Sequence, residues 1–231
     1  MIEKMVEACI LHVLELGTPA TLREPYIPYI PKNWNGVLVL AEAQNHAGAN
    51  VKYLKRLESL TAQQRYERLY LDGDRVGIQP WDDGTLKFAV EAAFRIAASE
   101  TAVSNAILWS LRKSELANER PSRELGKASS LVWKDLLALL KPSHVIAAGA
   151  EARGVLEIAL KDRPQPKRTH WALPSPRVLL PLSSMVNEAD LFMRFPAVAK
   201  MAKRREEWLN TGSQRSKILY ACLAVSTAGD A

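Results

Sequence analysis

Polar side chains that can bind or activate a ligand follow three of four short apolar segments in this sequence. A carboxylate or an imidazole can orient or deprotonate water, a side-chain amide can both donate and accept hydrogen bonds, and serine and arginine can contact phosphate. These residues are Glu42, Gln44, Asn45 and His46 after the first segment, Asn105 at the end of the second, and Ser175 and Arg177 after the fourth. Each group is weak alone, and the elements that carry them decide whether they can meet.

The four apolar segments are predicted to be buried strands because polar or turn residues bound each of them. Longer segments with helical spacing lie between them, and this alternation predicts an α/β fold. The expected architecture is a three-layer α/β/α sandwich around a central, mostly parallel four-stranded sheet. The predicted strands are Gly36–Ala41, Thr101–Asn105, His144–Ala148 and Thr169–Leu173, and the predicted helices are Val51–Leu71, Leu86–Ala98 and Ser130–Leu140.

Ligands of such sheets bind beyond the carboxyl ends of the strands, so the polar groups above are expected to share one crevice. The third strand ends instead in Gly149-Ala150, which opens a helix whose first amides could hold an anion. Trp81, in Gly77–Trp81 before the second helix, is a candidate for stacking on a ligand ring. It could equally pack against that helix.

Composition favours an anionic partner. The chain has 231 residues and a formal net charge of +6, with much of the excess in Lys161–Arg168 and Lys200–Arg205. This balance points to nucleic acid first, although solvated helix ends would give the same counts. Two distant cysteines and no long apolar run are expected for a cytoplasmic protein without membrane contact. No interdomain linker is found, so residues 1–231 are expected to form one domain.

The ordered motifs resemble those of the uracil-DNA glycosylase superfamily. The segment Ala41–His46 is similar to the family's first motif, of the kind Gly-Gln-Asp-Pro-Tyr-His or Gly-Glu-Ala-Pro-Gly. Asn105 matches the asparagine of the second strand, and Leu139–Arg153 resembles the third-strand unit. Leu173-Pro174-Ser175-Pro176 is similar to the last motif, His-Pro-Ser-Pro. The resemblance spans Gly36 to Arg177 in the right order and spacing.

Several positions depart from the family pattern. Ala43 stands where one branch has the aspartate that positions water, and Gln44 replaces the motif proline. Leu173 replaces the histidine that stabilises the departing base. Two cysteines cannot supply the iron–sulfur cluster of the Gly-Glu-Ala branch, so no cofactor and no metal are expected.

The resemblance implies a role for each candidate residue. Base excision needs an extruded nucleotide, an amide that reads the base edge, and a stabilised leaving group. Asn105, Gln44 and Trp81 would bind the base, although Asn105 could instead cap a loop. Glu42, Asn45 and His46 would orient the water, although His46 could merely bond a loop carbonyl. Ser175 and Arg177 would contact DNA, and a tight turn with an exposed arginine is the alternative for them.

The predicted function is a DNA glycosylase-like activity on uracil or a related deaminated base. The alternative, motivated by Ala43 and Leu173, is a non-catalytic nucleic-acid-binding protein of the same fold. A third reading, a nucleotide- or phosphate-ester-processing α/β enzyme, lacks a Walker or dinucleotide fingerprint.

Overall fold

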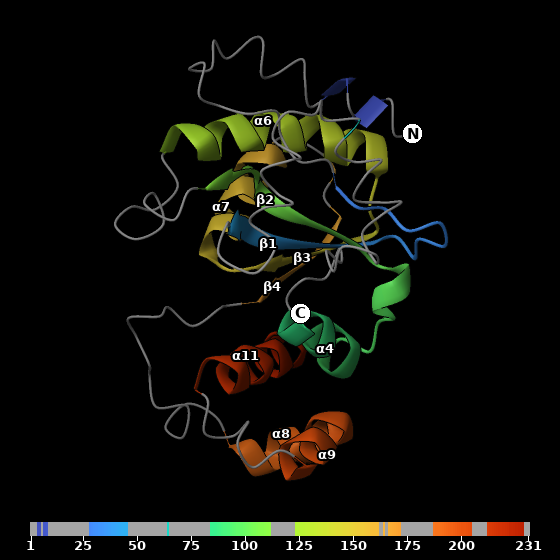
Figure 1. The fold of residues 1–231 in the computed structure, drawn as a ribbon, viewed down its shortest axis with the longest axis vertical. Helices are drawn as coiled ribbons and strands as arrows, with labels where there is room; N and C mark the ends of the chain where they lie inside the picture. Colours follow the sequence, from blue (N-terminus) through green and yellow to red (C-terminus); the bar gives the residue numbers. More distant parts are fainter. Residues whose placement is uncertain are drawn as a thin grey trace.

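The structure is a computed structural model, and it describes residues 4, 5, 7, 8, 28–45, 64, 84–111, 123–161, 164, 166–171, 187–204 and 212–228. Four parallel strands form one sheet in the order β2-β1-β3-β4. They are β1 (Val37–Asn45), β2 (Ala102–Leu111), β3 (His144–Ala148) and β4 (Lys167–Trp171). The predicted α/β/α sandwich with a parallel four-stranded sheet is therefore confirmed (Figure 1).

Helices α6 (Arg123–Leu140) and α7 (Ala150–Ala159) cover one face of the sheet, here called the α7 face (Figure 1). Alternate residues of β1 point to this face, since Leu38 and Leu40 lie in the same buried cluster as Val155 and Leu156 of α7. Trp133 of α6 is fully buried in this cluster, and its indole N–H donates to the carbonyl of Ala106 at 2.9 Å.

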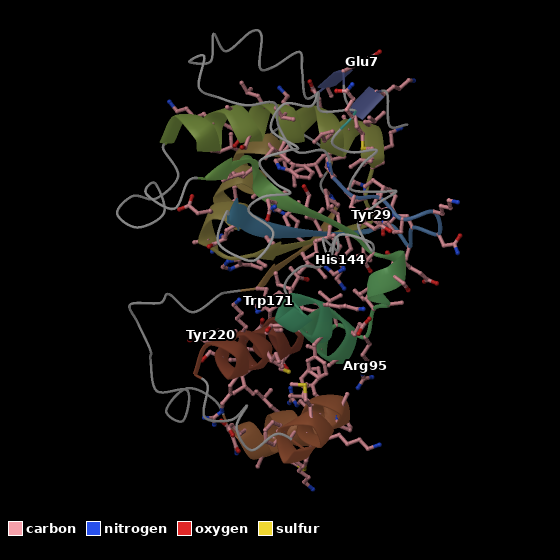
Figure 2. The ribbon with its side chains drawn as sticks, in the orientation of Figure 1. Glu7, Tyr29, Arg95, His144, Trp171 and Tyr220 are labelled. Carbon is pink, nitrogen blue, oxygen red and sulfur yellow. The ribbon has the colours of Figure 1, made fainter. Side chains whose placement is uncertain are left out.

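The other face, here called the α4 face, is covered by α4 (Gly84–Ala93) and α11 (Gly212–Ala228) (Figure 1). Val39 and the fully buried Trp171 point to this side. In Figure 2 Trp171 lies between the sheet and these two helices, and its ring packs against Phe94 with centroids 6.0 Å apart. Its indole N–H donates to the carbonyl of Lys217 at 2.9 Å, which fixes α11 to the end of β4.

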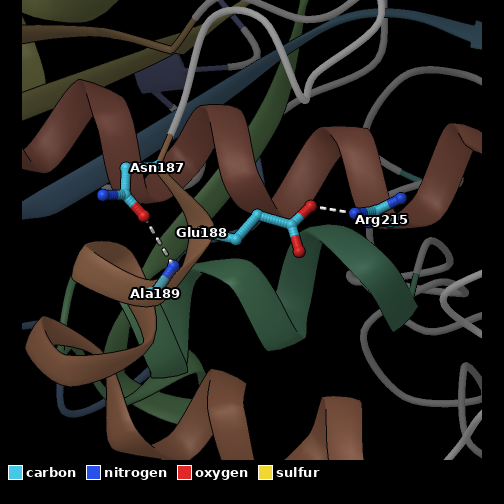
Figure 3. A network of polar contacts seen from close by, with 4 residues as sticks. All are labelled: Asn187, Glu188, Ala189 and Arg215. Carbon is cyan, nitrogen blue, oxygen red and sulfur yellow. Dashed lines mark hydrogen bonds and ion pairs between the residues drawn. The ribbon is translucent and has the colours of Figure 1, made fainter.

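Helices α8 (Glu188–Arg194) and α9 (Pro196–Arg204) lie outside α4 and α11 and add a further layer to the α4 side (Figure 1). The side chain of Asn187 caps α8 by accepting a hydrogen bond from the N–H of Ala189 at 3.1 Å. Glu188 forms an ion pair with Arg215, which ties α8 to the first turn of α11 (Figure 3).

The strand bounds differ from those predicted in three of four cases. β3 has the predicted bounds, but β1 and β2 continue past Ala41 and Asn105, and β4 begins two residues earlier than expected, with the end of its predicted range outside the described residues. β1 and β2 pair with each other as far as Asn45 and Leu111, so the backbone groups of the polar end of β1 are satisfied by the ladder with β2. β4 starts with the exposed pair Lys167 and Arg168, as suits an edge strand.

The helix bounds also differ, for reasons visible at their ends. α4 stops at Ala93 rather than continuing to Ala98, because Arg95 adopts a left-handed backbone with φ +56°. The N–H groups of Phe94 and Ile96 both bond to the carbonyl of Val90, at 3.2 and 3.5 Å, as the chain leaves the helix. α6 starts seven residues before the predicted Ser130 and ends before Lys141, another left-handed residue with φ +49°. The predicted helix Val51–Leu71 lies outside the described residues, apart from Gln64.

Candidate functional site at the carboxyl edge of the sheet

The direction in which the chain winds reverses between β1 and β3. The connection from β1 to β2 includes α4 on one face, whereas α6 and α7 make the connections to β3 and β4 on the other. Parallel sheets leave a crevice for ligands at such a reversal, beyond the carboxyl ends of the strands. The first residues beyond the β1–β3 ladder, whose last pair is Leu40 with Ala147, therefore define the candidate site.

Glu42 lies at this edge, two residues beyond that last pair. Its position in β1 places it on the α7 face, like Leu38 and Leu40. The carboxylate accepts hydrogen bonds from the backbone N–H groups of Ala150 and Glu151, at the start of α7. The carboxylate of Glu42 thus occupies the anion site that was expected at this helix N-terminus.

The environment of Glu42 raises the pKa of its carboxyl group above the ordinary 4.5. The largest cause is burial of the carboxyl group, although the residue as a whole keeps an exposed surface. The charge of Glu151 raises the pKa further. The two backbone hydrogen bonds and the charge of Lys217 lower it, but they do not reverse the shift. A carboxylate with a raised pKa is a stronger base and is typical of catalytic groups.

Asn105 lies near the same edge but on the opposite face. Its α-carbon is the register partner of Ala41 on the neighbouring strand, and it follows Val103 by two residues. Val103 belongs to the α4-face cluster, so alternation places the half-buried Asn105 on that side. The prediction that Asn105 ends its strand is wrong, because β2 continues to Leu111. Glu42 and Asn105 could therefore contact one ligand only across the end of the sheet.

Two residues that the sequence did not predict as site residues lie at or near this edge. His170 is in register with Ala147 on the α7 face, and its ring hydrogen-bonds to the backbone of Gly149. Burial and the nearby Arg153 lower the pKa of His170, while the bond to Gly149 and the charge of Glu157 oppose this shift. Lys217 of α11 is close enough for its charge to act on Glu42. Lys217 and Glu42 are 175 positions apart in the 231-residue chain, so no local motif joins them.

The first-motif prediction that Glu42, Gln44 and Asn45 follow their strand is wrong, since all three belong to β1. The backbone of Asn45 pairs with that of Leu111 after an irregularity in the ladder. The other predicted site residues lie outside the described residues: His46, Trp81, Ser175 and Arg177. Trp171 ends β4, and β4 and β2 are the two edge strands, about 14 Å apart for three strand spacings. The predicted Ser175–Asn105 proximity thus requires the chain after β4 to turn back across the edge.

The described basic residues of the segment 161–168 lie at the other edge of the sheet, where the strands begin. Lys167 starts β4 opposite His144, and Lys161 follows the last turn of α7. Lys161, Lys167 and Arg168 are all exposed, as solvated helix and strand ends would be.

Neither a scan against models of known protein families nor a search of curated proteins finds a match to this chain. The likeness to the uracil-DNA glycosylase superfamily therefore rests on the motif residues themselves. Within the described part of the chain, no group of three or more His, Cys, Asp or Glu side chains could hold a metal ion. In the same part, no helix is long and apolar enough to cross a membrane.

Proposed function

We propose that this protein binds DNA, reads an extruded base at the carboxyl edge of its sheet, and hydrolyses the N-glycosidic bond of uracil or a related deaminated base. The observation that carries the proposal is the position of Glu42. Its carboxylate stands at the winding reversal between β1 and β3, fixed by the amides of α7, with a raised pKa.

Glu42 would orient and deprotonate the attacking water. A fixed carboxylate loses little mobility when the water binds, and its raised pKa makes it a better proton acceptor. The transition state carries positive charge on the sugar, which a nearby carboxylate also stabilises. The first motif lacks the family's aspartate at Ala43, so Glu42 is the acidic side chain left in that motif.

Asn105 would bind the base edge with its amide from the adjacent strand, where its α-carbon is level with Ala41. The charge of Lys217 adds positive potential near the same edge, which favours an anionic ligand such as DNA. The alternative of DNA binding without chemistry is favoured by one specific departure, Leu173 in place of the leaving-group histidine.

The test is incubation with single- and double-stranded oligonucleotides that each carry one modified base, followed by alkaline cleavage of abasic sites. We expect release of uracil or a related deaminated base, its loss in Asn105→Ala, and a decrease of about 10²- to 10³-fold in Glu42→Gln. Ser104→Ala is the matched control, because Ser104 is the neighbour of Asn105 on β2 and points to the other face.

Each contrary outcome has a distinct meaning. DNA binding without release of any base would replace the catalytic proposal with the non-catalytic one. Release that persists in Asn105→Ala would show that Asn105 does not bind the base. The absence of both binding and release would contradict the proposal as a whole.

A further inference from the structure

Gly149 joins four elements at the point where the candidate site is formed. It follows the last residue of β3 and immediately precedes α7. Its N–H donates to the carbonyl of Trp171 at the end of β4 at 2.8 Å, and its carbonyl accepts from the N–H of Arg153 at 3.2 Å. Its α-carbon also faces the side chain of Glu42 from β1.

Two independent features require glycine here. The backbone has φ +100° and ψ +167°, a combination that only glycine adopts without strain. A β-carbon built on Gly149 would also lie 2.7 Å from both Cγ and Cδ of Glu42, and closer still to its Oε1. Glu42 is the flexible partner in this contact, so any side chain at position 149 would displace its carboxylate.

We propose that Gly149 is a positioning residue for Glu42: its bare α-carbon lets the carboxylate lie against the first amides of α7. The catalytic consequence of this inference rests on the proposed function. The placement of the Glu42 carboxylate by Gly149 does not depend on it. Gly149 touches no reacting group, and it acts only through the place that it leaves for the Glu42 side chain.

The chain offers two matched controls. Gly36 also has a positive φ, +83°, and a β-carbon there would lie 2.7 Å from the side-chain oxygen of Ser143. It precedes β1 at the opposite edge of the sheet, so Gly36→Ala imposes comparable strain away from the site. Gly154 lies within α7, and a β-carbon there would meet nothing within 4 Å. Gly154→Ala therefore tests substitution in the helix without strain.

The experiment measures base release against pH, and the titration of the Glu42 side-chain carboxyl carbon by NMR, in the full-length protein. We expect Gly149→Ala to lower release by about 10²-fold, as expected for loss of one preorganised group, and to shift the Glu42 titration toward lower pH. Gly36→Ala and Gly154→Ala should keep the wild-type pH profile and Glu42 titration. In a Glu42→Gln background, Gly149→Ala should cause no further loss.

Wild-type Glu42 titration and release in a folded Gly149→Ala protein would overturn the inference. If the wild type releases no base, the proposed function fails, and the Glu42 titration in Gly149→Ala still decides the role of Gly149. If Gly149→Ala does not fold, the contact between Glu42 and the α7 amides is tested in the wild type instead. The amide NMR signals of Ala150 and Glu151 should shift with pH as Glu42 titrates, and this shift should be absent in Glu42→Gln. Amide signals that ignore pH in both proteins would contradict the contact on which the inference depends.

Discussion

At the scale of single residues, Glu42 is held by backbone groups from a distant part of the chain. The residue type and its place after an apolar segment made it a candidate. Its hydrogen bonds to Ala150 and Glu151 join positions more than 100 residues apart, and they depend on β1 and β3 being neighbours in the sheet. His170 and Lys217 were not predicted as site residues, because tertiary contacts rather than local spacing place them near this edge.

Glu42 should make the stability of the protein depend on pH in a defined direction. Because its folded pKa is raised above 4.5, the folded state holds this proton more tightly than the unfolded state does. The stability that results is present below pH 4.5 and is lost as pH rises through the folded pKa. Denaturant unfolding of the wild type and Glu42→Gln from pH 4 to 7 should therefore show the variant gaining relative stability with rising pH. A difference that stays constant over this range would contradict the shift.

At the scale of elements, apolar patterning predicted where strands and helices exist better than where they end. β3 was predicted with its observed bounds because turn residues bound it, Pro142-Ser143 before it and Gly149 after it. The polar end of β1 was read as a loop, although its backbone pairs with β2. Helices α4 and α6 end just before Arg95 and Lys141, which adopt left-handed backbones although neither is a glycine that would signal a helix end in the sequence.

Lys141 gives a direct test of such a left-handed helix end. A left-handed backbone costs a residue with a β-carbon roughly 1 kcal/mol more than it costs glycine, so Lys141→Gly should raise the free energy of unfolding by up to about 1 kcal/mol. Lys127→Gly, at an exposed position inside α6, should instead lower it by about 1 kcal/mol. Chemical denaturation of both variants checks the sign. Destabilisation by Lys141→Gly would show that glycine's extra freedom in the unfolded chain outweighs the relief of strain.

At the scale of the whole molecule, the alternation of strands and helices was sufficient to predict the parallel sheet and its two covered faces. The sequence pattern does not predict the order of the strands in the sheet, and this order determines which residues can share a site. It brings Glu42 and Gly149 together, and it sets Asn105 on the far side of β1 from β3. The net charge could likewise be read from the sequence, but the positions of the charged residues in the fold could not. The exposed Lys167 and Arg168 lie at the edge where the strands begin, away from the candidate site.

The central claim is that DNA is bound at the carboxyl edge of the sheet. The most direct test is the change in backbone amide NMR signals when a short oligonucleotide containing one deoxyuridine is added to isotope-labelled protein. We predict the largest changes at Asn105, Gly149, Ala150 and Glu151, with smaller ones at Gly36, Ser143 and His144, where the strands begin. Changes concentrated at that second group, or on α8 and α9, would contradict the account.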